Sequence, residues 1–534
     1  MKKSKKILSV ALALSLACPM MAACGSSSGD LIITASERGY GLEWLDAIVE
    51  KYEEKTGIDV AVIKKIGMSG QNAITTEIES LSGDTDIFFS TGTELFSGLY
   101  KGQIVAANGI TYDRMFAPLD SVYQTTVEGE SKSIAQKTNA HVLNSYELDG
   151  HYYSTPWHHS LMGIVLNVDI FTTLGYTEAD IPKTTEEMFA LCDDILAKPA
   201  VGEGKNAKKV APFIFSSINE YYTSFFPIWF AQYEGKTVYE DYYCEGKDPD
   251  GEVSEYVYTF EGQEKALDVL ARLIKPIKKD GDVDYQHEKS DELEFTDMQG
   301  WFLADQAVFC VNGGWLDIEM ANYKGKNMKF IKTPVISSLV EKLSFYTGDV
   351  AQDDAKLRTL IDYVDEHPKT NDFENMPTFA SEADVKKVRE ARQMAYKGGS
   401  GGITLVPSWS DKIDLAKDFL TYMLSDEGLC EYYRATGGGI LPTKLSDDSK
   451  SYPTVQMSTF RQNQMEIFSE GHLLRKTTEK ARLYAIAGVS STFNNGMAGV
   501  PGVVLREGNL TAKDIMQTNQ QTVSSKWSTI EKLL

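Results

Sequence analysis

The stretch Asp149–Val168, DGHYYSTPWHHSLMGIVLNV, decides the fold. It is rich in aromatic and β-branched residues, which favour extended chain. Two strand-like segments run end to end here, with little turn chemistry between them. No helix separates them, although strands elsewhere in the chain alternate with helices. A direct passage of this kind is expected where a chain crosses from one folded lobe to another.

Upstream of this stretch, strands and helices alternate. Residues 31–35, 59–66 and 86–91 are apolar enough for strands, and 73–81 for a helix. A further helix is predicted from a set of apolar residues at the i, i+3, i+4, i+7 positions of one face: Leu45, Ile48, Val49 and Tyr52. This alternation indicates βαβ units and a largely parallel sheet.

Downstream, the same plan is repeated. Thr184 and Glu187 have the spacing of a capping box, ahead of a helix with a buried stripe formed by Met188, Leu191, Cys192 and Ile195. Residues 338–399 are charged and are expected to form at least two helices, the second capped by Ser381 with Asp384. We interpret 338–399 as an insertion.

The fold class predicted is therefore α/β, with two discontinuous lobes and hinge crossings between them. A chain of 534 residues also exceeds what one hydrophobic core supports. The N-terminal lobe is expected to comprise residues 31–157 and 331–445, with the insertion inside it. The C-terminal lobe is expected to comprise 158–330 and 446–534.

The N-terminus has the pattern of an exported lipoprotein. A head of four lysines precedes an apolar run, Ile7–Ala23, that ends in small residues. This pattern predicts a secretory signal peptide over residues 1–23. Residues 21–24, MAAC, further resemble a bacterial lipobox, in which Cys24 receives a diacylglycerol. We expect residues 24–30 to form a short tether that holds the protein on the extracytoplasmic face of the membrane.

The charge balance excludes two classes of partner. The formal net charge is −23, and loss of residues 1–23 removes four lysines and no acid, which leaves −27. Such a surface repels nucleic acid and anionic lipid. We therefore predict no nucleic-acid partner and expect the lipid on Cys24 to be the membrane anchor.

No metal or cofactor is predicted. The spacing of Cys192, Cys244, Cys310 and Cys430 fits no metal motif, and we expect packed, unpaired thiols. Asp280, Asp282 and Asp284 begin like a calcium loop, but the sixth and twelfth positions lack the required Gly and Glu.

Several separate stretches resemble one family along nearly all of the mature chain. They include SERGYGLEW at 36–44, TDIFFSTGTELFSGLYKGQI at 85–104, INEYYTSFFPIW at 218–229, NGGWLDIEM at 312–320 and GGGILPTK at 437–444. In this order they resemble the extracellular solute-binding proteins of ABC-type carbohydrate importers, the maltose-binding-protein-like group. The resemblance implies a two-lobed periplasmic-binding-protein fold, a carbohydrate ligand and ABC permease subunits as partners.

The resemblance also implies ligand-facing residues. It assigns this role to Glu37 and Arg38, to Ser90, Thr93 and Glu94, to Glu220 and Tyr222, and to a stacking tryptophan at Trp315. Asn494 stands where the family's late aromatic residue lies, and Ser90 where maltose-binding protein has a tryptophan. These two departures argue against a glucose-polymer site and for a more polar saccharide.

Two of these assignments have support from the residues themselves, and two further residues are added at the lobe crossing. Trp315 follows two glycines at the end of an apolar strand, and Glu37 follows a strand's carboxyl end, where α/β sheets bind ligands. Trp157 and His158 lie at the lobe crossing and are predicted to touch ligand, although a structural histidine explains His158 equally well. His158 and His159 are expected to point to opposite faces because they are adjacent on a strand.

The function expected is capture of a carbohydrate, such as an oligosaccharide, by a monomeric receptor that is not an enzyme. No pair of carboxylates stands out as acid and nucleophile. The alternatives are a surface-anchored glycan-processing enzyme, a peptide, polyamine or iron receptor of the same fold, and a structural or sensory lipoprotein.

Overall fold

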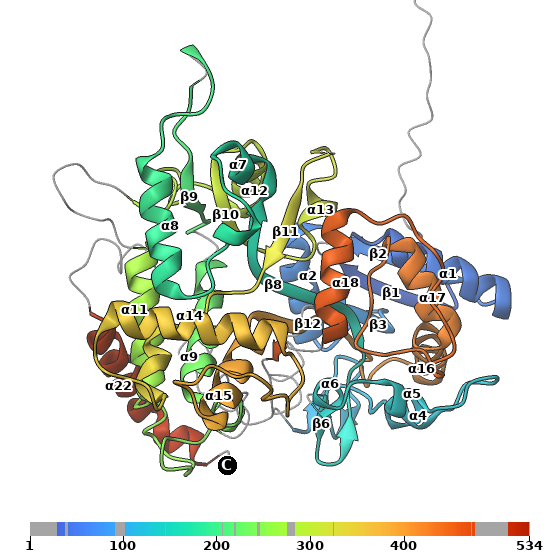
Figure 1. The fold of residues 1–534 in the computed structure, drawn as a ribbon. Helices are drawn as coiled ribbons and strands as arrows, with labels where there is room; N and C mark the ends of the chain where they lie inside the picture. Colours follow the sequence, from blue (N-terminus) through green and yellow to red (C-terminus); the bar gives the residue numbers. More distant parts are fainter. Residues whose placement is uncertain are drawn as a thin grey trace, which may run out of the picture.

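The protein has two lobes connected by two long strands, β8 (Pro156–Asn167) and β12 (Tyr396–Leu405) (Figure 1). This computed structural model describes residues 29–37, 41–90, 102–144, 146–204, 207–217, 221–242, 246–274, 284–323, 325–470, 473–475 and 511–532. The predicted direct crossing between lobes is β8.

The first lobe contains short parallel strands, a few two-residue strands and surrounding helices. Its elements are β1 (Leu31–Ser36), α1 (Glu43–Thr56), β2 (Val60–Lys65), α2 (Gly67–Glu79), β3 (Ile87–Ser90), β4 (Ile104–Val105), β5 (Thr111–Tyr112), α4 (Asp120–Gln124), α5 (Ile134–Lys137), α6 (Ala140–Asn144), β6 (Glu147–Leu148), β7 (His151–Tyr152), α16 (Ile413–Met423) and α17 (Asp426–Ala435).

The second lobe is larger and more helical. Its elements are α7 (Val168–Thr173), η1 (Glu178–Asp180), α8 (Thr185–Ala197), β9 (Ala211–Ile214), η3 (Tyr221–Ser224), α9 (Phe225–Glu234), α10 (Lys236–Glu240), α11 (Glu261–Ile274), α12 (Phe295–Leu303), β10 (Ala307–Gly313), α13 (Leu316–Glu319), β11 (Met328–Ile331), η5 (Ser337–Lys342), α14 (Val350–Glu366), α15 (Glu382–Gln393), α18 (Thr459–Glu470), β13 (Leu473–Arg475) and α22 (Ala512–Ile530).

One sheet extends through both lobes. Its strand order is β2-β1-β3-β12-β8-β10-β9, with β11 paired to β8 and β13 to β12. β1 is parallel to β2 and β3, as the βαβ pattern predicted, and β10 is parallel to β9. β8 and β12 are antiparallel to each other and to their other neighbours on this path. The lobes are therefore joined by paired backbone rather than by loose linkers.

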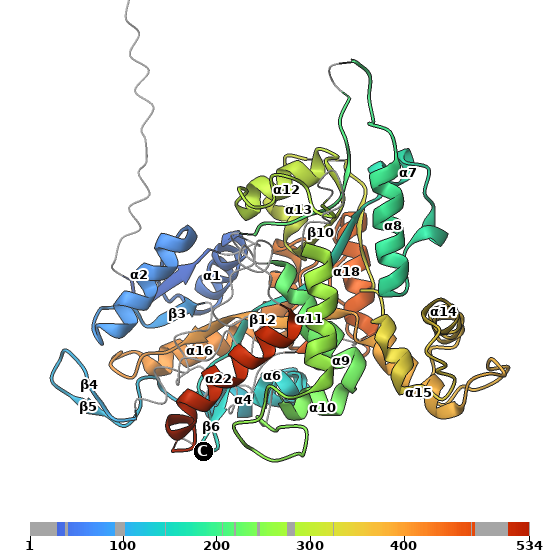
Figure 2. The ribbon, with the colours of Figure 1, turned by 90° about the vertical axis from the view of Figure 1, so that its left-hand side faces the viewer.

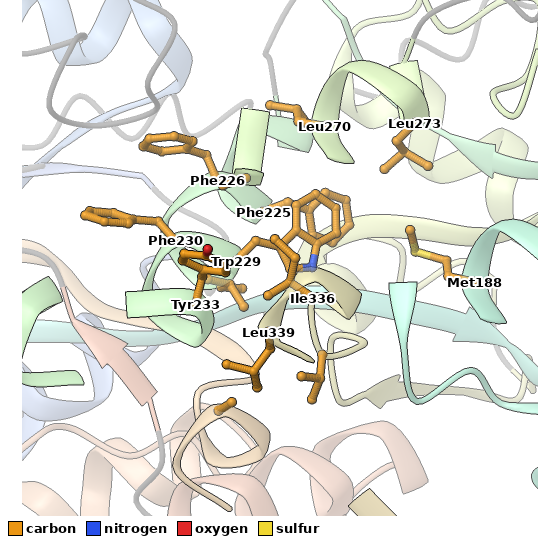
Figure 3. Close-up of a cluster of buried hydrophobic side chains, with 14 of the residues drawn as sticks. Met188, Phe225, Phe226, Trp229, Phe230, Tyr233, Leu270, Leu273, Ile336 and Leu339 are labelled. Carbon is orange, nitrogen blue, oxygen red and sulfur yellow. The ribbon is translucent and has the colours of Figure 1, made fainter. Parts of the chain in front are cut away.

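Each lobe has its own apolar core. In the first lobe, the predicted helix face of Leu45, Ile48, Val49 and Tyr52 is buried against the sheet and against α16 and α17. In the second, Phe225 and Trp229 stack at 4.7 Å between ring centroids, and Met188 and Ile336 belong to the same buried cluster (Figure 3). α22, at the end of the chain, lies along α11 in the same core (Figure 2). Two separate cores allow the lobes to move as units.

The segment 338–399 packs in the second lobe, which corrects its assignment to the first. Apolar faces on α14 and α15, including Leu357, Leu360 and Val388, are buried in the same cluster as Trp229. The chain therefore returns to the first lobe along β12, and not at residue 331. The reason is that α14 packs on α15 and η5, and α15 and η5 pack on α9. Position along the chain does not show these partners.

Most local predictions are confirmed. The Thr184 hydroxyl accepts from the Glu187 amide, while the Glu187 carboxylate accepts from the Lys183 amide instead of closing a capping box. Ser381 and Asp384 do form a capping box.

Cys192 and Cys310 are buried free thiols, and burial raises the pKa of both. Among the described residues, no helix combines the length and apolar character needed to span a bilayer.

A buried charge cluster lies in the first lobe, beside the segment that follows α17. The Lys137 ammonium, with a fully buried side chain, donates to Glu130 at 2.5 Å and to Asp426 at 3.2 Å. Asp426 also accepts from the Ser446 hydroxyl at 2.6 Å and from Lys450 at 2.6 Å. The segment that follows α17 is thereby fixed to α5.

This cluster predicts an acid-sensitive step. Burial raises the pKa of the Asp426 carboxyl, but hydrogen bonds from Lys450 and Ser446 and the charge of Lys137 outweigh burial and lower it from 3.8 to about 2. The folded state therefore favours the charged carboxylate. Its contribution to stability is complete above the unfolded pKa of 3.8 and is lost as the pH falls toward about 2.

We expect Asp426→Asn to lower the unfolding temperature near neutral pH and to flatten the fall in stability across that acid range. Thermal unfolding followed by circular dichroism at a series of pH values measures both effects. Asp448→Asn, which changes a fully exposed carboxylate nearby, is the matched control. Identical acid profiles for the two variants would contradict this role of Asp426.

Candidate functional site

The carboxyl ends of β1 and β3 meet at one edge of the sheet. Ala35 lies opposite Phe89 in the parallel register, so Glu37, just beyond β1, lies near Ser90 at the end of β3. Glu37 is half-buried, and its amide donates to the Lys65 carbonyl at 2.9 Å. Ser90 is fully buried, and its hydroxyl accepts from Gln71 Nε2 at 3.4 Å. Both predicted residues therefore lie at the sheet edge where ligands are expected, but only Glu37 is partly exposed.

Trp157 connects this edge to the hinge strands. Its indole Nε1 donates to the Ser90 carbonyl and to the Ile403 carbonyl, each at 3.0 Å, and its ring stacks on Trp44. A Cβ at Gly402 would lie 2.4 Å from the indole, so glycine is required there. Trp157 is 0% exposed. The structure thus gives Trp157 a packing role at the crossing, and its contact with ligand stays a prediction.

The two adjacent histidines point to opposite sides of β8, as predicted. His158 lies between Trp157 and Trp315, with ring centroids 5.8 and 6.2 Å away. His159 packs on Phe468 of α18 at 4.7 Å. His158 is therefore the one of the pair that lies at the junction of the lobes, and it is nearly buried.

Trp315 follows β10 and is half-buried beside His158. The two preceding glycines do not simply expose it. A Cβ at Gly313 would lie 2.3 Å from the Trp315 ring, and one at Gly314 would lie 2.3 Å from Gln464 Oε1. The glycines therefore allow the indole to fold back over its own backbone and allow α18 to approach. Close packing against Gly313 holds the Trp315 ring in place, and part of the ring remains exposed to solvent.

α18 fixes the Trp315 loop through two polar side chains, Arg461 and Gln464, that local sequence patterns did not indicate. Gln464 Nε2 donates to the Gly314 carbonyl at 3.0 Å, and Arg461 pairs with Asp317 at 3.1 Å. Arg461 and Gln464 are buried. Arg461 and Gln464 lie three residues apart on one helix face, and this spacing is visible in the sequence. It does not reveal their partners, because those lie about 150 residues earlier in the chain.

The remaining predicted residues divide into two sets. Tyr222 is buried in the second core, where its ring meets Phe215 edge-on at 5.8 Å, and no described contact joins it to Trp315. Five predicted ligand residues and the lipidation site lie outside the described residues: Arg38, Thr93, Glu94, Glu220, Asn494 and Cys24. The structure therefore brings together Ser90, Trp157, His158 and Trp315 in a continuous series across the junction.

The junction combines aromatic rings with a few polar groups. It offers an accessible aromatic face and a carboxylate on a rigid sheet edge, and aromatic rings with a few polar groups are typical of preformed ligand sites. Within the described ranges, no group of three His, Cys, Asp or Glu side chains is placed to hold a metal ion.

Comparison with known proteins supports a specific family. The family described as bacterial extracellular solute-binding protein matches residues 47–457. No curated protein matches the chain significantly.

Solved structures share the two-lobed fold. An ABC transporter solute-binding protein of Thermotoga lettingae, bound with α-D-tagatose, is 14% identical with a TM-score of 0.56, over 93% of this chain and 99% of that chain. An ABC substrate-binding protein of Listeria monocytogenes, in complex with cycloalternan, gives the same four values. The maltotriose-binding protein of Thermus thermophilus, bound with maltotriose, is 14% identical with a TM-score of 0.53, over 93% and 99%. At these identities the likeness establishes the fold alone.

The packing of Trp157 predicts that Gly402→Ala is destabilising. The added methyl would overlap a buried indole that is anchored by two hydrogen bonds, so strain in β8 and β12 is expected. Overpacking of this kind costs about 1–3 kcal/mol. Unfolding in urea measures the loss.

Gly102→Ala is a comparison for the added methyl, because nothing lies near its Cβ. Its φ of +66° is itself unfavourable for alanine, whereas Gly402 is not among the glycines with positive φ. A loss of stability below about 1 kcal/mol for Gly402→Ala would show that the tight contact is unimportant.

Proposed function

The chain belongs to the bacterial extracellular solute-binding proteins, and on that premise we propose that it captures a carbohydrate between its two lobes and delivers it to an ABC transporter permease. The ligand class is supported by the structural neighbours, since the three described above were solved with α-D-tagatose, cycloalternan and maltotriose. We infer a receptor rather than a glycan-processing enzyme because the neighbours named for their role are solute-binding or substrate-binding proteins.

The position of Trp315 carries this proposal. A sugar ring presents aliphatic C–H groups on its faces and hydroxyls at its edge, so a receptor needs an aromatic plate and polar groups beside it. Trp315 supplies a rigid plate at the lobe junction, and Glu37 supplies a carboxylate on the opposite lobe. Hydrogen bonds to charged groups contribute about 1.5–3 kcal/mol each. Arg38, Thr93, Glu94, Glu220 and Asn494 complete the proposed contacts.

Ligand binding is coupled to lobe closure in this proposal. Trp315 belongs to the second lobe and Glu37 to the first, so a sugar contacts both only when the lobes approach each other. A ligand shifts a conformational equilibrium by the difference in its affinity for the two states. Bending of β8 and β12 relates these states, and the closed form presents the loaded receptor, as a monomer, to the permease.

We further propose that Cys24 carries the lipid that keeps the receptor at the extracytoplasmic face of the membrane. The MAAC motif and the Gly- and Ser-rich residues that follow it support this anchor. Confinement beside the permease raises the effective concentration of the receptor there. Two acyl chains or more give stable anchoring, whereas one is marginal.

Trp315→Ala is expected to weaken saccharide binding by roughly 10- to 100-fold, because the stacking surface is lost. The unfolding temperature of the unliganded protein should change little, since the ring is half exposed. A thermal-shift screen of a saccharide panel identifies a ligand, and isothermal titration then gives the affinity of each variant. Trp527→Ala, which removes a half-buried tryptophan from α22, is the control and should retain full affinity. Equal affinities for Trp315→Ala and the parent would reject this assignment.

Cys24→Ala is expected to release the protein from the cell envelope into the soluble fraction, because no acyl chain can then be attached. Fractionation with and without detergent, followed by immunoblotting, measures the change. Cys430→Ala, a thiol within the folded part, should leave the protein in the membrane fraction. Membrane retention of both variants would contradict the lipid anchor.

A further inference from the structure

A recess lies in the second lobe, lined in part by the end of the short helix that follows Trp315. α12 and the turn after α13 together line a cavity of about 490 Å³. Its lining includes Asp297, Gly300 and Trp301 from α12, and Glu319, Asn322 and Tyr323 from α13 and the following turn. A volume in this range accommodates a small organic ligand.

Two exposed aromatic rings border the recess. Trp301 is 38% exposed and Tyr323 is 42% exposed, although each ring has a fixed neighbour. Trp301 packs edge-on against the buried His287 ring at 5.0 Å, and a Cβ at Gly300 would come within 3.2 Å of the Tyr323 hydroxyl. Large apolar faces held rigidly in contact with water are a mark of a binding surface.

The polar side chains that line the recess are mainly carboxylates, which accept hydrogen bonds, and amides, which both donate and accept. Glu319 accepts from Gln299 Nε2 at 2.7 Å, and Gln299 is fully buried and also contacts Asn312. The Glu319 carboxylate is therefore held by a buried support. Asp297 and Asn322 are exposed at the rim. Within the described part of the chain, the lining contains no basic side chain, so the recess does not suit an anion.

We propose that this α12–α13 recess is a second saccharide site, in which Trp301 and Tyr323 contact the faces of a sugar ring and Asp297, Glu319 and Asn322 accept or donate to its hydroxyls. Aromatic faces combined with carboxylates and an amide match a sugar ring, which has both apolar faces and hydroxyl edges. The Trp315 side chain does not line the site, and the site does not require lobe closure, because all its lining residues belong to the second lobe. It retains sugar at the receptor surface when the junction between the lobes is occupied or empty.

The test uses the full chain from residue 24, labelled with 5-fluorotryptophan, so that each tryptophan gives its own ¹⁹F resonance. Trp301→Phe assigns the relevant signal. Glucose, galactose, xylose, N-acetylglucosamine, maltose and lactose are titrated separately. At least one is expected to shift the Trp301 signal with a dissociation constant of about 1 mM or weaker, in both the parent and Trp315→Ala. The Trp315→Ala background separates this site from the one between the lobes.

Two variants test the contacts. Tyr323→Ala is expected to weaken the Trp301 titration by ~10-fold, whereas Tyr346→Ala, which removes another exposed tyrosine from the second lobe, should leave it unchanged. A Trp301 signal that no sugar moves overturns the proposal, and so does a shift that Tyr323→Ala does not reduce. Choline is titrated as a comparator, because carboxylates beside aromatic rings also bind quaternary ammonium ions. A response to choline and to no sugar likewise overturns the saccharide assignment.

Discussion

The rest of the architecture depends on the hydrogen bonds of the Trp157 indole, which tie the crossing strands to the first lobe. One N–H is shared between the Ser90 carbonyl, at the end of a first-lobe strand, and the Ile403 carbonyl, on a strand that crosses between lobes. The ring also fills the space that Gly402 leaves without a side chain. A buried, hydrogen-bonded indole resists displacement because both its apolar area and its polar group lose their partners together. The crossing strands are therefore held in register where they enter the first lobe.

From that point outward, each lobe is stabilised separately. The first has a sheet covered by helices and closed by the Lys137–Asp426 cluster, and the second has an aromatic core around Trp229. Among the described residues, the lobes are joined by β8, β12 and the segment after α17, and Ile318 after β10 packs against the first core. A molecule built in this way changes shape by bending its crossing strands while its cores stay packed. The separation of the cores is thus what makes a hinged receptor possible.

The two proposed binding surfaces depend on the same rigid framework. Trp315 is placed by a glycine pair and by α18, so its exposed face needs no ordering when a ligand arrives. The recess between α12 and α13 is similarly supported by the buried Gln299. Pre-organised side chains lose less conformational entropy on binding than free ones. Both proposed sites, at the junction and between α12 and α13, therefore use aromatic rings that are already ordered.

Local patterns in the sequence were enough to identify the strands of the first lobe, the buried helix faces, the cap at Ser381 and the crossing at 149–168, because each rests on residues a few positions apart. They also indicated the opposite orientations of His158 and His159, since alternation along a strand is a property of the backbone. They did not reveal that 338–399 joins the second core, that Trp157 is buried, or that Arg461 and Gln464 hold the Trp315 loop. Those features depend on which apolar face and which polar group meet after folding, and their partners lie up to several hundred residues apart. Spacing along the chain carries no information about such encounters, because only the packed arrangement brings the groups within bonding distance.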